Sequence, residues 1–430
     1  MMRLFNLRRW PLAGLRPRQT RLLLSVLPLA LVLLAAAPSC TTRAACSCLN
    51  TEHEVALELP VDSAQNDRLI ESWQAYRSRF IQDDGRVIDR EDSDRTVSEG
   101  QAYAMLRAVA VNDPATFDRT YTWAKNNLTR MDEKGQPSDL LWAWKWGQRP
   151  DGSWGSLDAN FATDADIDAA TALILAARRW SCPQYLDDAR ALLADIWEHS
   201  TVEFPDGTRQ LIPGPTEAFS LEPSQVILNP SYFAPASFRL FAEVDRDHDW
   251  NRLIDSGYAL LDDLATFSAT GLPADWIAYN PATGTYRQLP LDYPLQSRYS
   301  FDAYRVWWRI SQAAAWFDDP RAQAYLEART PELIRRWQQD QRLPARLTLD
   351  GGAEASYEAT AHYAMLYPAL LRVDPGTAEE ILRQKLEPAY KNGFWDSDIA
   401  YYTQNLAWFG LLPLEVSPDR FTTASGECPS

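Results

Sequence analysis

The sequence predicts an all-α protein: an (α/α)6 barrel of six inner and six outer helices, with long loops that form a cleft at one end. Hydrophobic periodicity marks about twelve helical stretches along the chain. Strand signals are scarce and are confined to two candidate hairpin pieces, Leu211–Pro213 and Tyr286–Leu289. The helical stretches alternate between an apolar and a half-charged type, and their connections alternate between short and long.

The helical stretches differ in how their charges are distributed. The even-numbered ones, such as 97–111 and 166–180, are rich in Ala, whereas odd-numbered ones such as 64–81 and 184–199 have a charged face. A helix that is apolar nearly all round is buried, and a half-polar helix lies at the surface. We therefore expect the even stretches to form the inner ring and the odd stretches the outer ring. In chain order the stretches are 64–81, 97–111, 114–129, 166–180, 184–199, 231–245, 248–267, 300–316, 320–338, 355–371, 375–388 and 398–411.

Connection length alternates in step with helix type. The even stretches from the second to the tenth are each followed by a short connection, as at 111–114 and 318–320. The connections before even stretches are longer, most clearly at 130–165, 200–230 and 268–299. Short turns are therefore expected at one end of the barrel and long loops at the other, where the inner helices begin. Loops on a rigid scaffold are where sites are built, so we expect the cleft at this second end.

The first 40 of the 430 residues have the pattern of an export signal. Arginines from Arg3 onward precede an apolar run, Leu22 to Ala37, and such a sequence is typical of a secretory signal. Cys40 follows this run and is a candidate for lipid attachment. We expect an exported monomer, periplasmic or secreted, or anchored to the membrane as a lipoprotein. The predicted segments are a signal peptide or lipoprotein signal at 1–40, a linker at 41–62, one barrel domain at 63–415 and a C-terminal tail at 416–430.

The composition argues against several classes of ligand. A net charge of −16 disfavours a phosphate backbone, so we expect no nucleic-acid partner. The four His and five Cys fit no zinc-site spacing, so we expect neither a metal nor a cofactor. Cys46 and Cys48 are candidates for a disulfide, but the pairing cannot be read from the sequence. The 17 Trp and 18 Tyr offer flat apolar faces that suit sugar rings, and they suit the filling of a core equally well.

Three inner helices are predicted to begin with a carboxylate at the cleft end. Glu99 lies in the first turn of the second stretch, Asp164 opens the fourth, and Asp302 lies in the first turn of the eighth. A competing interpretation is helix capping, because Thr96 and Glu99 have capping-box spacing and acidic residues favour first turns. We favour a shared site because the three helix starts fall on one rim, beside Trp-rich loops.

Two carboxyl groups in different protonation states are what glycoside hydrolysis requires. Glu99 can hold a proton near neutral pH only if burial or a nearby carboxylate, for which Asp164 is the candidate, raises its pKa. Asp302 lies three inner helices further round, which leaves room for a water, as in inverting enzymes whose carboxyls lie roughly 6.5–9.5 Å apart. Arg305, one turn after Asp302, is expected to face the same side. It would either bond a sugar hydroxyl or keep Asp302 ionised.

Aromatic residues gather in the segments that lead to the inner helices. Trp142 and Trp144 precede the fourth stretch, Tyr232 starts the sixth, and Tyr401 and Tyr402 start the twelfth. These five are the candidate substrate-binding aromatics, because rings in a row along a cleft offer stacking platforms for sugars. The alternative interpretation is that some of them pin the long loops to the barrel.

Three segments resemble glycoside hydrolase family 8, in order along roughly residues 64–412. The long segment from Ala162 through Thr163-Asp164-Ala165-Asp166 to Trp180 resembles the family signature. The segment Ser98-Glu99-Gly100-Gln101-Ala102-Tyr103 resembles the region of the general acid, and Ser300-Phe301-Asp302-Ala303-Tyr304-Arg305 resembles that of the base in the glucan-cutting subgroup.

The resemblance implies an (α/α)6 barrel and an inverting endo-1,4-β-glucanase, a cellulase acting on cellulose-like β-glucan. It implies Glu99 as general acid and Asp302 as general base. Asp164 is implied to hold the sugar at the cleavage point in a distorted conformation and to orient the water. Phe301 departs from the family, which often has Tyr before the base, and this puts the ordering of the water in doubt.

Other functions remain open at this stage. The same fold could act on xylan, chitosan or mixed-linkage glucan, and an acidic cleft would suit cationic chitosan. A non-catalytic saccharide-binding protein is a further alternative, although the presence of all three carboxylates argues against it. A prenyl-cyclising all-α enzyme would need metal-binding aspartates on an inner helix, whereas Asp187 and Asp188 lie on an outer stretch.

Overall fold

A computed structural model describes residues 55–221 and 225–421. The predicted export signal at 1–40 with Cys40, residues 41–54 of the predicted linker, and residues 422–430 of the predicted tail lie outside the described residues. Within the described ranges, no helix is both long and apolar enough to cross a bilayer.

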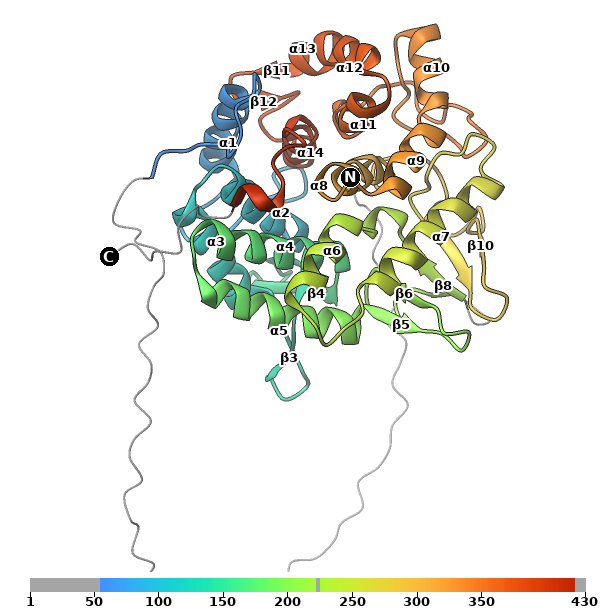
Figure 1. Ribbon diagram of the computed structural model, residues 1–430. Helices are drawn as coiled ribbons and strands as arrows, with labels where there is room; N and C mark the ends of the chain where they lie inside the picture. The colour runs from blue at the N-terminus through green and yellow to red at the C-terminus, as the bar shows by residue number, and fades with distance from the viewer. Residues whose placement is uncertain (1–54, 222–224, 422–430) are drawn as a thin grey trace, which may run out of the picture. The chain divides into compact units, whose positions relative to one another are not determined.

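The described part of the chain folds into the expected double ring of helices, with the outer helices surrounding the inner ones in Figure 1. Successive inner helices pack against each other, and each outer helix packs against an inner one. The ring closes between its last and first members, where Arg107 donates to Asn405 at 3.2 Å and the rings of Tyr103 and Phe409 lie 5.1 Å apart. The inner helices are α2 (Ser98–Ala110), α4 (Thr163–Arg179), α6 (Pro235–Val244), α8 (Tyr304–Trp316), α11 (Thr360–Val373) and α14 (Tyr401–Leu411). The outer helices are α1 (Asn66–Phe80), α3 (Pro114–Asn127), α5 (Pro183–His199), α7 (Asn251–Phe267), α9 (Pro320–Arg329) and α12 (Pro375–Ile381).

Burial follows the charge pattern that predicted the two rings. Every residue of α4 from Thr163 to Ala176 is buried. Its outer neighbour α5 buries one stripe only, at positions three or four apart: Tyr185, Ala189, Leu192, Leu193 and Ile196. An apolar stripe of this width is what one packed face of a helix requires.

Short turns at the closed end of the barrel join five of the inner helices, α2, α4, α6, α8 and α11, to the outer helix that follows each of them. Asn112 and Asp318 adopt left-handed backbone angles, with φ of 62° and 48°, which end the inner helix. Asp113 and Asp319 then cap the outer helix, accepting from the N–H groups of Thr116 and Arg321 at 3.0 Å each. A proline follows each cap, at the first helical position, where its missing N–H costs no hydrogen bond.

Several predicted helix limits are wrong. The predicted helix 320–338 is two helices, because Pro331 begins a new one, α10 (Pro331–Asp340). The predicted helix 375–388 is α12, the π-helical segment η2 (Leu382–Leu386) and α13 (Glu387–Ala389). Helix α6 begins later than predicted, because residues up to Tyr232 form a separate 3-10 turn, η1 (Pro230–Tyr232).

The long connections fold into small antiparallel sheets that the sequence analysis largely missed. In the first sheet, the long strand β3 pairs with β1, with β2 and with β4. The second sheet has the order β10-β9-β8-β7. The candidate hairpin pieces overlap β6 and β10 at their ends. The strands of the first sheet are β1 (Thr96–Val97), β2 (Thr129–Met131), β3 (Pro137–Gln148) and β4 (Trp154–Phe161). The others are β5 (Thr201–Glu203), β6 (Arg209–Leu211), β7 (Ser220–Leu221), β8 (Gln225–Leu228), β9 (Ile277–Asn280), β10 (Thr285–Arg287), β11 (Tyr390–Lys391) and β12 (Phe394–Trp395).

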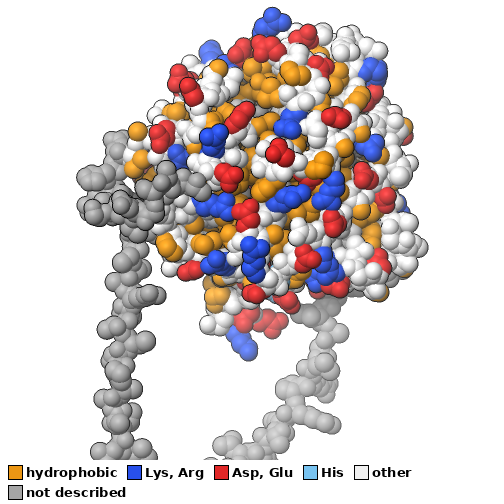
Figure 2. All heavy atoms as spheres, in the orientation of Figure 1, with side chains coloured by type: hydrophobic (Ala, Val, Ile, Leu, Met, Phe, Trp, Pro, Cys, Tyr) orange, Lys and Arg blue, Asp and Glu red, His pale blue; other side chains and the backbone are white. Residues whose placement is uncertain are grey.

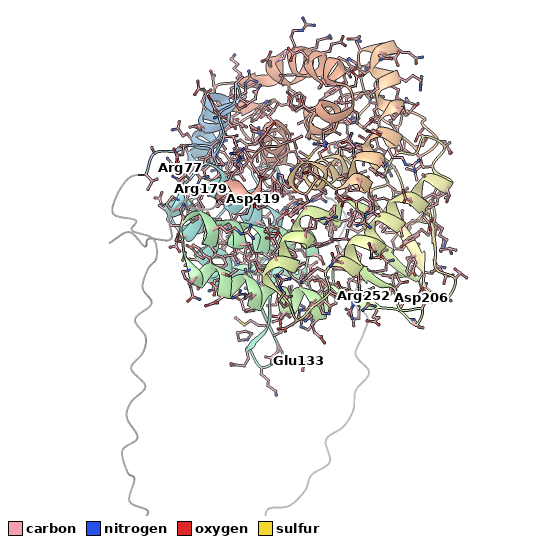
Figure 3. The ribbon with its side chains drawn as sticks, viewed as in Figure 1. Arg77, Glu133, Arg179, Asp206, Arg252 and Asp419 are labelled. Atoms are coloured by element: carbon pink, nitrogen blue, oxygen red, sulfur yellow. The ribbon has the colours of Figure 1, made fainter. Side chains whose placement is uncertain are left out.

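The C-terminal end of α4 is tied to distant parts of the chain. Arg179 donates to Ala110 and Asn112 at the end of α2, at 3.1 and 3.2 Å, and stacks on Phe421 of η3 (Pro418–Phe421). Figure 3 shows Arg179 beside η3 and Glu133 at the tip of the β2–β3 turn, pointing away from the helices. On the face drawn in Figure 2, Lys and Arg are interspersed with Asp and Glu, so no single-sign patch dominates it.

Cys182, in the turn after α4, is fully buried and disulfide-bonded.

Candidate active site

The three predicted carboxylates meet at one guanidinium, that of Arg305. Its Nη1 donates to Glu99 Oε1 at 2.7 Å and to Asp164 Oδ2 at 2.6 Å. Its Nη2 donates to Asp302 Oδ1 at 2.8 Å and to Ser231 Oγ at 3.0 Å. Arg305 is only 2% exposed, so these bonds form away from bulk water. The side chains come from the starts of α2 and α4 and from the segment that leads into α8, so the predicted convergence at the long-loop end is confirmed.

Glu99 is placed by a strand that runs directly into a helix. β1 pairs with β3, Thr96 opposite Trp146, and α2 begins at the next residue, Ser98. The hydroxyl of Thr96 donates to the carbonyl of Val87 at 2.7 Å, and no side chain caps α2. The capping-box interpretation of Glu99 is therefore wrong, and its carboxylate is left for the shared site.

Hydroxyl and charged groups surround the Glu99 carboxylate. Tyr103, one turn along α2, donates to Oε1, and Tyr401 donates to Oε2, at 3.1 Å each. Burial raises the pKa of Glu99 to about 7, although Arg305 lowers it, and the charges of Asp164 and Asp302 raise it further. A carboxyl with this pKa holds its proton near neutral pH, as a general acid must.

The sequence predicts Asp302 in the first turn of its helix, but in the structure it precedes the helix. It is in a tight turn in which Tyr304 N–H donates to Ser300 and Arg305 N–H to Asp302, at 3.0 and 3.1 Å, and α8 begins only at Tyr304. Burial raises the pKa of Asp302, and Arg305 opposes this shift. The predicted contact of Arg305 with Asp302 is confirmed, and its physical effect is to favour the ionised carboxylate.

Two residues that flank strands of the second sheet also act on Asp302, and the sequence did not predict this role for either. The polar side chains of Asn229 and Trp276 lower the pKa of Asp302. Asn229 follows β8, and its Oδ1 accepts from the N–H and the hydroxyl of Ser231 at 3.0 and 2.7 Å. This fixes the amide so that its nitrogen points away from Ser231. The sequence indicates Trp276 only as one of the aromatic residues in the loop before the eighth helical stretch, and it gives no signal for Asn229.

The candidate aromatic residues fall into two groups. Trp142 is 3% exposed and belongs to the hydrophobic core, while its N–H donates to Asp166 at 3.0 Å, so the structure gives it the loop-pinning role. Trp144 is half-buried, with the guanidinium of Arg95 5.9 Å from its ring.

The three tyrosines lie next to the carboxylate cluster. The ring of Tyr232 is 5.4 Å from the guanidinium carbon of Arg305, and Tyr401 bonds Glu99. Tyr402 donates to the backbone carbonyl of Phe301 at 3.1 Å, directly beside Asp302. Among the described residues, no group of three His, Cys, Asp or Glu is arranged to hold a metal ion.

The chain is similar in sequence and in fold to known endoglucanases. An endoglucanase from Escherichia coli (strain K12) is 31% identical over 340 residues, which cover 79% of this chain and 85% of that protein. An endoglucanase from Pseudomonas fluorescens (strain SBW25) is 37% identical over 257 residues, 60% of this chain and 63% of that protein. The crystal structure of an endo-1,4-D-glucanase from Vibrio fischeri ES114 is 27% identical, with a TM-score of 0.67 over 79% of this chain and 93% of that one. The model of the Glycosyl hydrolases family 8 matches residues 39–412. The chain therefore belongs to glycosyl hydrolase family 8 and is a glycoside hydrolase.

Proposed function

We propose that this enzyme is an endo-acting, inverting β-1,4-glucanase that cuts cellulose-like glucan, with Glu99 as general acid and Asp302 as general base. The observation that carries the proposal is the bridge of Arg305 between the two carboxylates. A guanidinium placed between them keeps them close without direct contact, and inverting enzymes need a gap of roughly 6.5–9.5 Å for the attacking water. The relatives named as endoglucanases support the choice of substrate.

The proposed reaction is a single displacement at the anomeric carbon. Glu99 gives its proton to the glycosidic oxygen as the bond from that oxygen to C1 breaks. A water attacks C1 from the opposite face, and Asp302 takes the proton that this water loses. The new hydroxyl has the inverted configuration, and proton exchange with solvent restores both carboxyls.

Asp164 and the aromatic residues would act on the sugar itself. Asp164 is 3% exposed and shares Arg305 with both reacting carboxylates, and its charge raises the pKa of each of them. This place supports a role in holding the sugar in a distorted conformation and in orienting the water. Trp144, Tyr232, Tyr401 and Tyr402 would provide faces and hydroxyls along the bound glucan.

The assignment of the acid is tested by the Glu99→Gln substitution. The amide keeps the shape of the carboxyl but has no proton to donate, so kcat should fall about 1,000-fold. Binding of cello-oligosaccharides, measured by calorimetry, should be nearly unchanged. Glu243→Gln, which changes a partly exposed residue ion-paired with Arg178 on α4, is the matched control and should leave kcat unchanged. Near-normal activity of Glu99→Gln would remove Glu99 from the proposal.

The stereochemistry and the substrate are tested on the wild-type enzyme. Anomer-resolved NMR of the first product should show the α-anomer, whereas a retained β-anomer would rule out Asp302 as the base for an attacking water. Reducing-sugar release should be highest from carboxymethylated or otherwise soluble β-1,4-glucan. A higher rate on xylan or chitosan, assayed in parallel, would reassign the substrate within the same fold.

We also propose that the enzyme is exported, as its first 40 residues predict. The buried disulfide of Cys182 supports this proposal, because structural disulfides persist mainly in oxidising compartments. Cell fractionation of the native producer should place the activity outside the cytoplasm. Activity confined to the cytoplasmic fraction would contradict the export proposal and leave the catalytic one intact.

A further inference from the structure

Asp275 is a buried carboxylate that the proposed reaction does not use. It is 6% exposed and immediately precedes Trp276, whose side chain lowers the pKa of Asp302. Its Oδ1 accepts from two backbone N–H groups, those of Ser300 at 3.2 Å and Ala303 at 2.9 Å. Its Oδ2 accepts from the hydroxyl of Ser300. The backbone N–H of Asp275 itself donates to the carbonyl of Arg298 at 2.7 Å, which fixes Asp275 to the same segment.

These bonds are made to residues on either side of Asp302 in the sequence. Ser300 lies two positions before Asp302, and Ala303 lies one position after it. Both donors belong to the turn that precedes α8, where regular helical bonding has not yet begun. One carboxylate therefore supplies the acceptor that the turn lacks on either side of Asp302.

The charge of Asp302 also acts on Asp275. Burial raises the pKa of Asp275 to about 7, and the charge of Asp302 is the next largest cause. Two buried carboxyls that interact in this way are costly for a fold, and an apolar residue at 275 would avoid the cost. The three bonds to the turn are the gain that offsets it.

We propose that Asp275 is a positioning residue for the base: its carboxylate holds the turn at 300–303 so that Asp302 points at the attacking water. The inference rests on the proposed role of Asp302. It assigns the preorganisation of the base to one named side chain outside the three converging carboxylates. A displacement of about 1 Å in such a group costs on the order of 100-fold in rate, so the hold matters for turnover rather than for binding.

Three variants separate this role from ordinary turn stabilisation. Asp275→Ala removes all three bonds, and kcat should fall about 100-fold while KM stays within about 3-fold. Asp275→Asn keeps an oxygen for both N–H groups and offers an amide to the Ser300 hydroxyl, so it should lie within about 5-fold of wild type. Ser300→Ala removes one bond of the three and should lower kcat about 5-fold.

Asp374→Ala is the matched structural control. Asp374 accepts from the N–H and the hydroxyl of Thr377 at 3.1 and 2.8 Å, the same kind of bonds, but it caps the outer helix α12 at the closed end. Its replacement should lower the melting temperature and leave kcat unchanged. If Asp275→Ala does not fold, the kcat of Ser300→Ala decides, and a wild-type value there overturns the proposal.

The outcomes also separate this inference from the proposed function. Asp302→Asn is assayed beside the other variants on soluble β-1,4-glucan. If it is active, the role of Asp302 as base fails. If it is inactive while Asp275→Ala has wild-type kcat, only the role of Asp275 fails. Equal losses in Asp275→Ala and Asp275→Asn would also overturn the inference, because they would show that the charge matters and not the hold on the turn.

Discussion

Arg305 brings one positive charge to three largely buried carboxylates, so it only partly offsets the rise in the pKa of Glu99 that burial causes. The guanidinium bonds Glu99, Asp164 and Asp302 at 2.6–2.8 Å, so it cannot neutralise all three. Removing the excess negative charge from a buried cluster is easiest if one carboxyl keeps its proton. The same arginine therefore favours an ionised Asp302 and tolerates a protonated Glu99.

The first prediction concerns the alkaline side of the pH profile and Arg305→Gln. Arg305 lowers the pKa of Glu99, so a neutral side chain there should let that pKa rise above about 7. The alkaline limb of kcat/KM, which reports loss of the proton from Glu99, should then move to higher pH. The rate itself should fall at least about 100-fold, because acid and base lose their common partner. A limb that stays in place, or moves to lower pH, would contradict the electrostatic account.

The second prediction concerns Tyr401→Phe. The Tyr401 hydroxyl donates to Glu99 Oε2, and this bond lowers the pKa of Glu99. Its removal should move the alkaline limb to higher pH, by less than Arg305→Gln does, because a bond to a neutral donor is weaker than an ion pair. Tyr402→Phe is the matched control, since that hydroxyl donates to the Phe301 carbonyl instead. Equal shifts in both variants would contradict a specific effect of Tyr401.

At the scale of elements, α11 and α14 cross with their backbones in contact. Pro368 lies inside α11 and has no N–H to give to the carbonyl of Ala364, one turn before it. Gly410 of α14 approaches this same carbonyl, and a Cβ built on Gly410 would lie only 2.0 Å from its oxygen. The proline and the glycine thus belong to one close crossing within the inner ring.

The third prediction follows from this crossing. Gly410→Ala places a methyl group against backbone, so α11 and α14 must move apart, and the free energy of unfolding should fall by about 1–3 kcal/mol. Gly376→Ala in the outer helix α12 is the control, because the nearest atom to its new Cβ would be 3.5 Å away. The control should be neutral or stabilised by up to about 1 kcal/mol. Chemical denaturation of both variants provides the measurement, and equal stability would contradict the account.

Two prolines, Pro331 and Pro368, show why helix limits were only partly predictable. Pro331 ends one helix and begins another, whereas Pro368 is accommodated inside α11, and nothing local distinguishes the two. The difference lies in packing: Pro368 is buried against α14, which holds the helix together across the missing bond. Strand β3 did carry a local signal, because Trp142, Trp144 and Trp146 alternate with other residues at the period of a strand.

For the whole molecule, the sequence predicts the barrel far better than it predicts the residues that hold the carboxylates of the site in place. Charge on the odd stretches and its scarcity on the even ones determine which helices are buried, and the starts of α2, α4 and α8 place Glu99, Asp164 and Asp302 on one rim. Asn229, Asp275 and Trp276 lie next to strands of the second sheet, and these strands are two to four residues long. Strands this short have no readable period, and their pairing depends on contacts between segments distant in sequence.

The last prediction concerns the stability of the whole fold, because the site holds carboxyls whose pKa values are raised. Folding raises the pKa of Glu99 from 4.5 to about 7 and that of Asp275 from 3.8 to about 7. Between these limits the folded state binds more protons than the unfolded chain, so the free energy of unfolding should fall as pH rises from about 4 to 7. Glu99→Gln removes one of these groups, so its melting temperature relative to wild type should increase from pH 4.5 to pH 8. Asp275→Asn should show the same trend independently. A difference in melting temperature that is constant with pH, or largest at pH 4.5, would contradict the claim that folding raises the pKa values of these two carboxyls.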